Sequence, residues 1–166
     1  MENDLAKFNI EKAAKEMLKR PLGSDFLIFS KEPEKIIQLS KIVAVDLSKK
    51  TESGEQWPHF IFDCKTKTLA NQQGRTVEIK TSDDEFTLKK VAEQIGGKTV
   101  CVLLILHFDN MHADMRINKW NQGFLRVMKG NEAGKSSIHK DSIIIAGYSG
   151  EGSIASDLYL PAFELI

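Results

Sequence analysis

Seven consecutive apolar residues, 100–106, constrain the fold of this chain more than any other segment. The run follows the glycine pair Gly96-Gly97 and ends at His107, the first residue of a polar cluster. A short apolar run between a breaker and a polar cluster is typical of a strand that is buried on both faces. We therefore expect residues at about 98–107 to form the central strand of a sheet. Side chains just beyond the end of such a strand are a common place for ligands in α/β proteins.

Length and composition predict one globular domain spanning residues 1–166. Hydrophobic residues make up 42% of the chain and charged residues 28%, which is ordinary for a folded domain. The 23 basic and 23 acidic residues give a formal net charge of zero. Proteins that bind nucleic acid or a membrane surface need a positive field, so this balance argues against both kinds of partner.

The sequence also predicts a cytoplasmic location. Its first twenty residues are charged throughout and contain no apolar segment of the kind found in signal peptides. The longest apolar run is too short to span a bilayer. Cys64 and Cys101 each lie within an apolar, strand-like segment, which favours buried free thiols in a reducing compartment.

Hydrophobic spacing and turn residues predict an α+β domain. Apolar positions 10, 13, 14, 17 and 18 share one helical face, and Pro33 suits the first turn of a second helix. Ser82 and Glu85 form a capping box for a third helix, which Gly96 ends. Strands are expected at 25–29, 42–47, 59–64, 68–72, 75–80, 141–146 and 155–160, with an antiparallel meander over 59–80. Residues 109–129 fit either a helix or a strand followed by a shorter helix.

These elements predict a single domain with a mixed, mostly antiparallel sheet. The central buried strand at about 98–107 lies within that sheet, and two to four helices pack against it. Hairpins mixed with separate helices favour this α+β arrangement over a strict alternation of strands and helices.

A first candidate site follows the apolar run, where His107, Asp109, His112 and Asp114 form an H-x-D-x-x-H-x-D pattern. Imidazole and carboxylate groups are suitable ligands for zinc, iron or manganese, and a bound metal could activate water. His107, Asp109 and His112 are therefore the candidate metal ligands. In the alternative that we favour, Asp109 caps a helix, His107 ends the strand, and His112 and Asp114 share a solvated first turn, so that no metal is bound.

A second candidate site joins Asp63 to Glu78 and Lys80. In form it resembles the PD-(D/E)xK nuclease core, in which an acidic residue on one strand meets E-x-K on a neighbouring strand. That resemblance implies two carboxylates that bind Mg²⁺ and a lysine that positions or activates water. The alternative, which we favour, is a solvent-facing charge pair on an antiparallel sheet.

The two tryptophans are the candidate protein-binding residues. Trp57 and Trp120 are both flanked by polar residues. Tryptophan is enriched at interface hot spots because its ring removes a large apolar area from water. The alternative for each is an ordinary, partly buried core residue.

Three classes of function remain open. The preferred one is a non-catalytic, cytoplasmic protein-binding module of the adaptor, inhibitor or immunity-protein kind, with another protein as partner and no cofactor. The second is a metal-dependent nuclease or hydrolase that uses one of the two candidate sites. The third is an accessory domain of a larger assembly.

Overall fold

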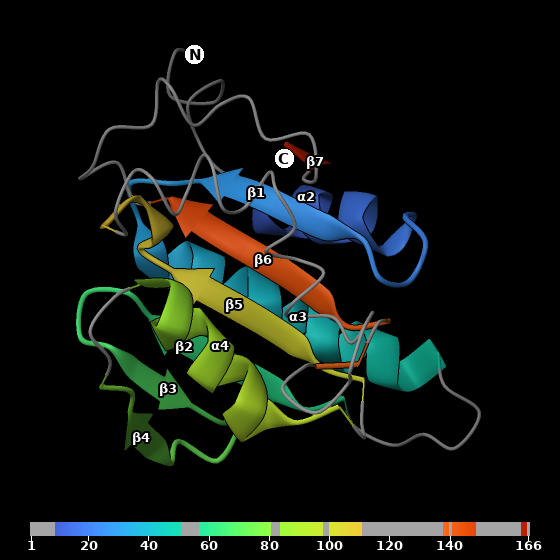
Figure 1. Cartoon of the computed structure of the whole chain (residues 1–166). Coiled ribbons are helices and arrows are strands. Elements are labelled where there is room, and N and C mark those ends of the chain that lie inside the picture. The colour runs from blue at the N-terminus through green and yellow to red at the C-terminus, as the bar shows by residue number, and fades with distance from the viewer. Residues whose placement is uncertain are drawn as a thin grey trace.

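The computed structural model describes residues 9–50, 57–80, 84–97, 100–110, 138–139, 141–148 and 164–165. Within these residues, seven strands form one sheet in the order β4-β3-β2-β5-β6-β1-β7 (Figure 1). The strands are β1 (Asp25–Phe29), β2 (His59–Asp63), β3 (Thr68–Ala70), β4 (Thr76–Glu78), β5 (Val102–Leu106), β6 (Ile143–Tyr148) and β7 (Glu164–Leu165).

Three α-helices cover the two faces of this sheet in the described part of the chain. Helices α2 (Ile10–Leu18) and α3 (Pro33–Lys50) pack against each other and lie behind the sheet in Figure 1, whereas α4 (Asp84–Ile95) lies in front. Asn9 caps α2, because its side chain accepts a hydrogen bond from the Lys12 amide at 3.1 Å. A short 3₁₀ turn, η1 (Phe108–Asn110), follows β5.

The α+β prediction is confirmed, with one difference in strand direction. The meander of β2, β3 and β4 is antiparallel as expected. The pairs β2–β5, β5–β6, β6–β1 and β1–β7 are all parallel, so the sheet is mostly parallel rather than mostly antiparallel. Two helical crossovers contribute to this: α3 lies between β1 and β2 in the chain, and α4 lies between β4 and β5. A helical crossover returns the chain to the same end of the sheet, and the next strand then runs parallel.

The predicted central strand is confirmed as β5. It lies between β2 and β6, and all five of its residues are buried. Its side chains alternate between the two faces. Leu103 and Ile105 join the buried cluster under α4, whereas Val102, Leu104 and Leu106 join the cluster under α2 and α3.

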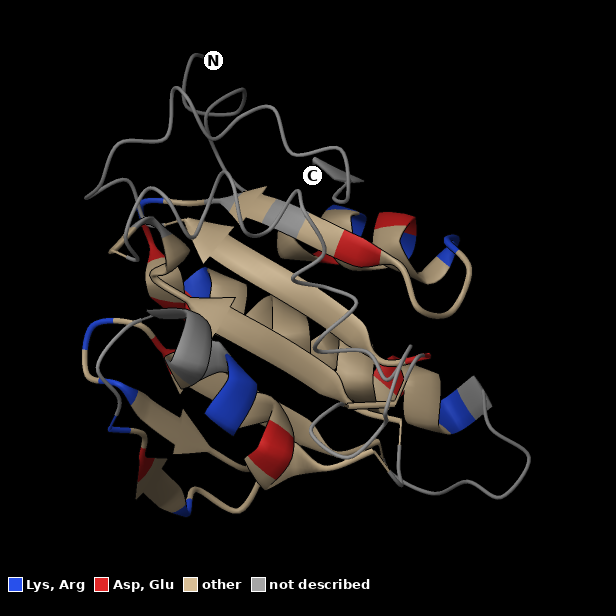
Figure 2. Ribbon diagram, viewed as in Figure 1, with Lys and Arg blue, Asp and Glu red and all other residues tan. Residues whose placement is uncertain are grey.

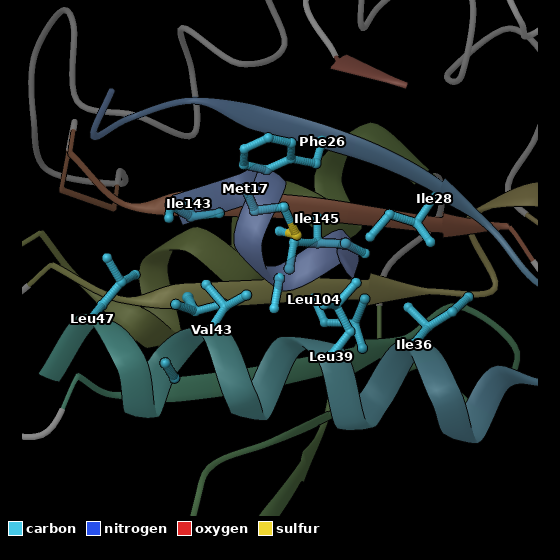
Figure 3. Packing of buried hydrophobic residues seen from close by; sticks show 14 of the residues in the cluster. Met17, Phe26, Ile28, Ile36, Leu39, Val43, Leu47, Leu104, Ile143 and Ile145 are labelled. Atoms are coloured by element: carbon cyan, nitrogen blue, oxygen red, sulfur yellow. The ribbon is translucent and has the colours of Figure 1, made fainter. Parts of the chain in front are cut away.

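The strand expected at residues 42–47 is wrong, because these residues are the second half of α3. Their β-branched residues favour a strand locally, but the chain has no breaker between 34 and 47. Instead, helical spacing places the side chains of Ile36, Leu39, Val43 and Leu47 against the sheet (Figure 3). Burial of this continuous apolar stripe stabilises one long helix.

Gly147 permits the close approach of α3 to the sheet. It lies in β6, which is Ile143–Tyr148 rather than the 141–146 expected from sequence. A Cβ atom at position 147 would lie 3.1 Å from Cγ2 of Ile36. Because that spacing is tighter than ordinary van der Waals contact, glycine lets the helix and the strand pack closely here.

Charged residues lie around this core and not in its centre. Strands β5 and β6 contain none, whereas basic and acidic residues alternate along the helices and the β2–β4 meander (Figure 2). Among the described helices, none combines the length and the apolar character that crossing a bilayer requires.

Candidate functional site

The carboxyl ends of β2, β5 and β6 lie side by side and carry the first candidate ligand, His107. This residue directly follows β5 and has a left-handed backbone, with φ of 56°. Such a conformation costs about 1–3 kcal/mol outside glycine and is found most often in functional or tightly constrained segments. The His107 carbonyl accepts a hydrogen bond from the Asn110 amide at 2.9 Å, which closes the η1 turn.

The residues at the carboxyl ends of these three strands are buried. Cys64 follows β2 and Tyr148 ends β6, and both are buried, as is His107. The rings of Phe108 and Tyr148 are 5.6 Å apart and tilted by 55°, an ordinary aromatic packing geometry. In the described residues, this end of the sheet is part of the core under α4.

The metal site proposed from sequence stays a prediction. Asp109 lies on η1, two positions after His107 in the chain, but His112 and Asp114 lie outside the described residues. Within the ranges that the structure covers, no three His, Cys, Asp or Glu side chains are grouped so that they could hold a metal ion.

The structure places Asp63 and Glu78 on strands that are not neighbours. Asp63 pairs with Thr68 of β3, and Thr68 pairs with Glu78 of β4, so the three residues form one row across the meander. Two strand spacings, about 9–10 Å, separate the backbones of the two acidic residues. Oxygen ligands lie about 2.0–2.6 Å from Mg²⁺, so a shared ion would need both side chains to converge over β3.

The interactions that these side chains make are local. The carboxylate of Asp63 accepts a hydrogen bond from the Lys65 amide at 2.8 Å. Glu78 lies 3.8 Å from the ammonium group of Lys80, and both side chains are exposed. The structure therefore brings Glu78 and Lys80 together as an exposed ion pair, which contributes little to stability.

Of the two candidate interface tryptophans, Trp57 lies in the core. It is 8% exposed and belongs to the same buried cluster as Val43 and Leu47 of α3. Its main-chain N–H donates to the hydroxyl of Ser48 at 2.7 Å. This placement favours the core alternative for Trp57, whereas Trp120 lies outside the described residues.

A buried histidine that sequence reasoning missed is His59, the first residue of β2. Its Nε2 lies 2.7 Å from the hydroxyl of Ser40 on α3. When that hydroxyl donates its hydrogen to the Ile37 carbonyl, which lies at 2.8 Å, the matching tautomer of His59 carries a hydrogen on Nε2 and donates it to Ser40. The signal in the sequence was a histidine at the start of an apolar strand segment, HFIFD.

Burial keeps His59 neutral. Loss of hydration, together with the positive charge of Lys41, lowers the pKa of His59 from 6.5 to about 4. Ser40 is itself fully buried, so this pair supports packing between α3 and β2 and is shielded from any substrate in solution.

Acid is expected to destabilise the protein through His59. Between pH 6.5 and 4 the unfolded chain binds a proton that the native state does not, so stability falls as the pH falls. Each pH unit in this window removes up to about 1.4 kcal/mol, which amounts to about 1.6 kcal/mol between pH 6.5 and 5. Urea denaturation across this range measures the loss. His59→Gln should flatten this part of the profile, and an unchanged slope in the variant would contradict the assignment.

The outer edge of the meander has features that sequence reasoning also missed. All three residues of β4 are exposed, and among the described strands none pairs with its outer side. Val77 is 47% exposed, although it lies in one row with the buried residues Phe62 and Leu69. The other exposed large apolar residues of the described part, Leu22, Ile42 and Val45, do not lie on strands.

The hydrogen-bond pattern of β3 and β4 shows which backbone groups face outward. The Ile79 amide donates to the Lys67 carbonyl, and the Asn71 amide donates to the Arg75 carbonyl. In an antiparallel ladder the residues alternate, so positions 75, 77 and 79 bond inward to β3. Thr76 and Glu78 therefore direct their N–H and C=O groups away from the sheet.

Comparisons with protein-family models, with curated proteins and with solved structures find no match for this chain.

Proposed function

We propose that this domain is a non-catalytic protein-binding module that takes up an extended segment of a partner protein along the outer edge of β4. The observation that carries this proposal is the exposed edge itself. Thr76 and Glu78 offer two donors and two acceptors to an incoming strand, and Val77 offers an apolar side chain between them. Strand addition to a sheet edge uses backbone bonds for affinity and the side-chain contacts for specificity.

The position of Val77 supports the same proposal. The row Phe62, Leu69 and Val77 runs from the core to the edge on the α4 side of the sheet. An apolar residue on an added strand, opposite Val77, would extend this row by one position. Exposed apolar area would then be removed from water, which favours association.

The distribution of charge supports a protein partner over a nucleic acid. The chain has no formal net charge, and both basic and acidic residues occur on the described helices and along the β2–β4 meander (Figure 2). A phosphate backbone would require a concentrated positive field. Cys64 and Cys101 are buried thiols that are not joined in a disulfide, which is compatible with a reducing compartment, and we extend the proposal to the cytoplasm on that basis.

Thr76→Pro tests this function. Proline removes the outward N–H of Thr76 and no bond to β3, so the fold should be retained. The wild-type protein should capture a partner from host lysate, and Thr76→Pro should capture at least tenfold less of the same partner. Cross-linking followed by mass spectrometry should place a contiguous partner segment beside β4.

The matched control is Val45→Lys, which alters an exposed apolar residue on α3. It should capture the partner as well as the wild type does. If both variants bind equally, or if Val45→Lys alone loses the partner, binding uses another surface and the proposal is wrong.

A further inference from the structure

We infer that the extended segment taken up at the β4 edge is β4 of a second copy of this chain, paired antiparallel about a two-fold axis through Val77. This inference rests on the proposed use of the β4 edge and names its occupant. The two sheets would join into one continuous sheet, with the two α4 helices on the same face.

The backbone of β4 is complementary to itself in this register. A two-fold axis at Val77 places Thr76 of one copy opposite Glu78 of the other, and the converse pair follows by symmetry. Both residues direct N–H and C=O groups outward, so each pair exchanges two hydrogen bonds and the short strand makes four in total.

The same register brings the exposed apolar residues together. The two Val77 residues form the pair between the hydrogen-bonded pairs, where Cα atoms of antiparallel strands approach to about 4.5 Å. Their side chains lie on one face and cover each other. Val77 is thus the side chain that gains most from this pairing.

Neighbouring registers are less favourable. If the two-fold axis moves by one residue, from Val77 to Glu78, the Glu78 residues of the two copies lie directly opposite each other, and their carboxylates repel. If the axis moves instead to Thr76, Val77 lies opposite Arg75 and Glu78 lies opposite Gly74. The φ of 81° at Gly74 ends the extended strand, so this register loses a backbone pair. In the Val77-centred register the two Glu78 residues are diagonal neighbours and do not face each other directly. Each Glu78 retains the ion pair with Lys80 of its own chain, at 3.8 Å.

The expected dimer is weak and depends on concentration. A ladder of three residues buries much less than the roughly 1,200 Å² typical of stable complexes. Sedimentation velocity should therefore show a monomer at low concentration and a growing dimer fraction as the protein concentration rises. Thr76→Pro should remain monomeric over the same range.

Cysteine cross-linking tests the register. In Val77→Cys the paired Cα atoms, about 4.5 Å apart, fall within the range for a disulfide, so mild oxidation should yield a covalent dimer. Thr76→Cys alone should not cross-link, because its counterpart is displaced by two residues, to about 8 Å. A mixture of Thr76→Cys and Glu78→Cys proteins should cross-link to each other. Cys64 and Cys101 are buried, so the wild-type protein should not cross-link and serves as the negative control.

A monomer in Val77→Cys after oxidation, or equal cross-linking of Thr76→Cys alone, would overturn the inference. The capture experiment separates its failure from that of the proposed function. If Thr76→Pro abolishes capture of a different polypeptide while Val77→Cys does not cross-link, the edge binds another protein and only the second copy is excluded. If neither experiment responds to the β4 variants, both proposals fail.

Discussion

Trp57→Ala is expected to lower the free energy of unfolding by about 3–5 kcal/mol, the range for removal of a large aromatic side chain from a core. The indole belongs to the buried cluster between the sheet and α3, and 8% of the residue is exposed. Truncation leaves a cavity that the long helix α3 cannot fill without moving. Urea denaturation at pH 7 measures the change.

Comparison with Trp57→Phe distinguishes a role of Trp57 in core packing from a role in binding a partner. Phenylalanine restores most of the buried volume, so this variant should recover more than half of the lost stability. The opposite outcome, in which Trp57→Ala keeps its stability but loses a bound partner, would restore the interface role predicted from the sequence.

Leu104→Ala is expected to cost about 2–5 kcal/mol, as for other large-to-small changes in a well-packed core. Leu104 is fully buried in the middle of β5, where it pairs with Ile61 of β2 and Ile145 of β6. Ladder bonds on both sides and helices on both faces hold the site, so little relaxation can fill the space. Chemical denaturation of the variant beside the wild type gives the value.

Val45→Ala is the control for Leu104→Ala, since Val45 is exposed on the helix that covers Leu104. Its effect should stay within about 0.5 kcal/mol, as for surface changes in general. A near-zero effect of Leu104→Ala would mean that β5 is not the centre of the core.

Local patterns in the sequence predicted much of this fold, and long-range relations were less accessible. The apolar run of β5 and the meander of β2 to β4 have strong local signals, and both are confirmed. The sequence prediction gave the wrong strand direction because it weighted the hairpin signals of residues 59–80, although a continuous apolar run such as that of β5 is more typical of parallel sheets. The second half of α3 was mistaken for a strand because β-branched residues favour strands locally, whereas burial against the sheet decides the outcome.

The candidate sites show the same limit. The pairing of Glu78 with Lys80 follows from their spacing along the chain, and the meander expected over 59–80 already placed a strand between Asp63 and Glu78. Trp57 has polar neighbours in the sequence and buried neighbours in space. The contact between Ser40 and His59 joins residues 19 positions apart, which no local pattern encodes.

The two serine hydroxyls of α3 join this helix to the start of β2, which lies two strands away from the β4 edge. Ser40 bonds to His59 and Ser48 bonds to the Trp57 amide, and each hydroxyl also donates to a carbonyl of α3 itself. A rotation of the helix by one residue would break both cross-links at once. β2 pairs with β3 and β3 pairs with β4, so the strand ladder connects the β4 edge to these two cross-links. A receptor edge that is already part of a ladder lowers the entropic cost of binding, so an incoming strand loses mainly its own conformational freedom.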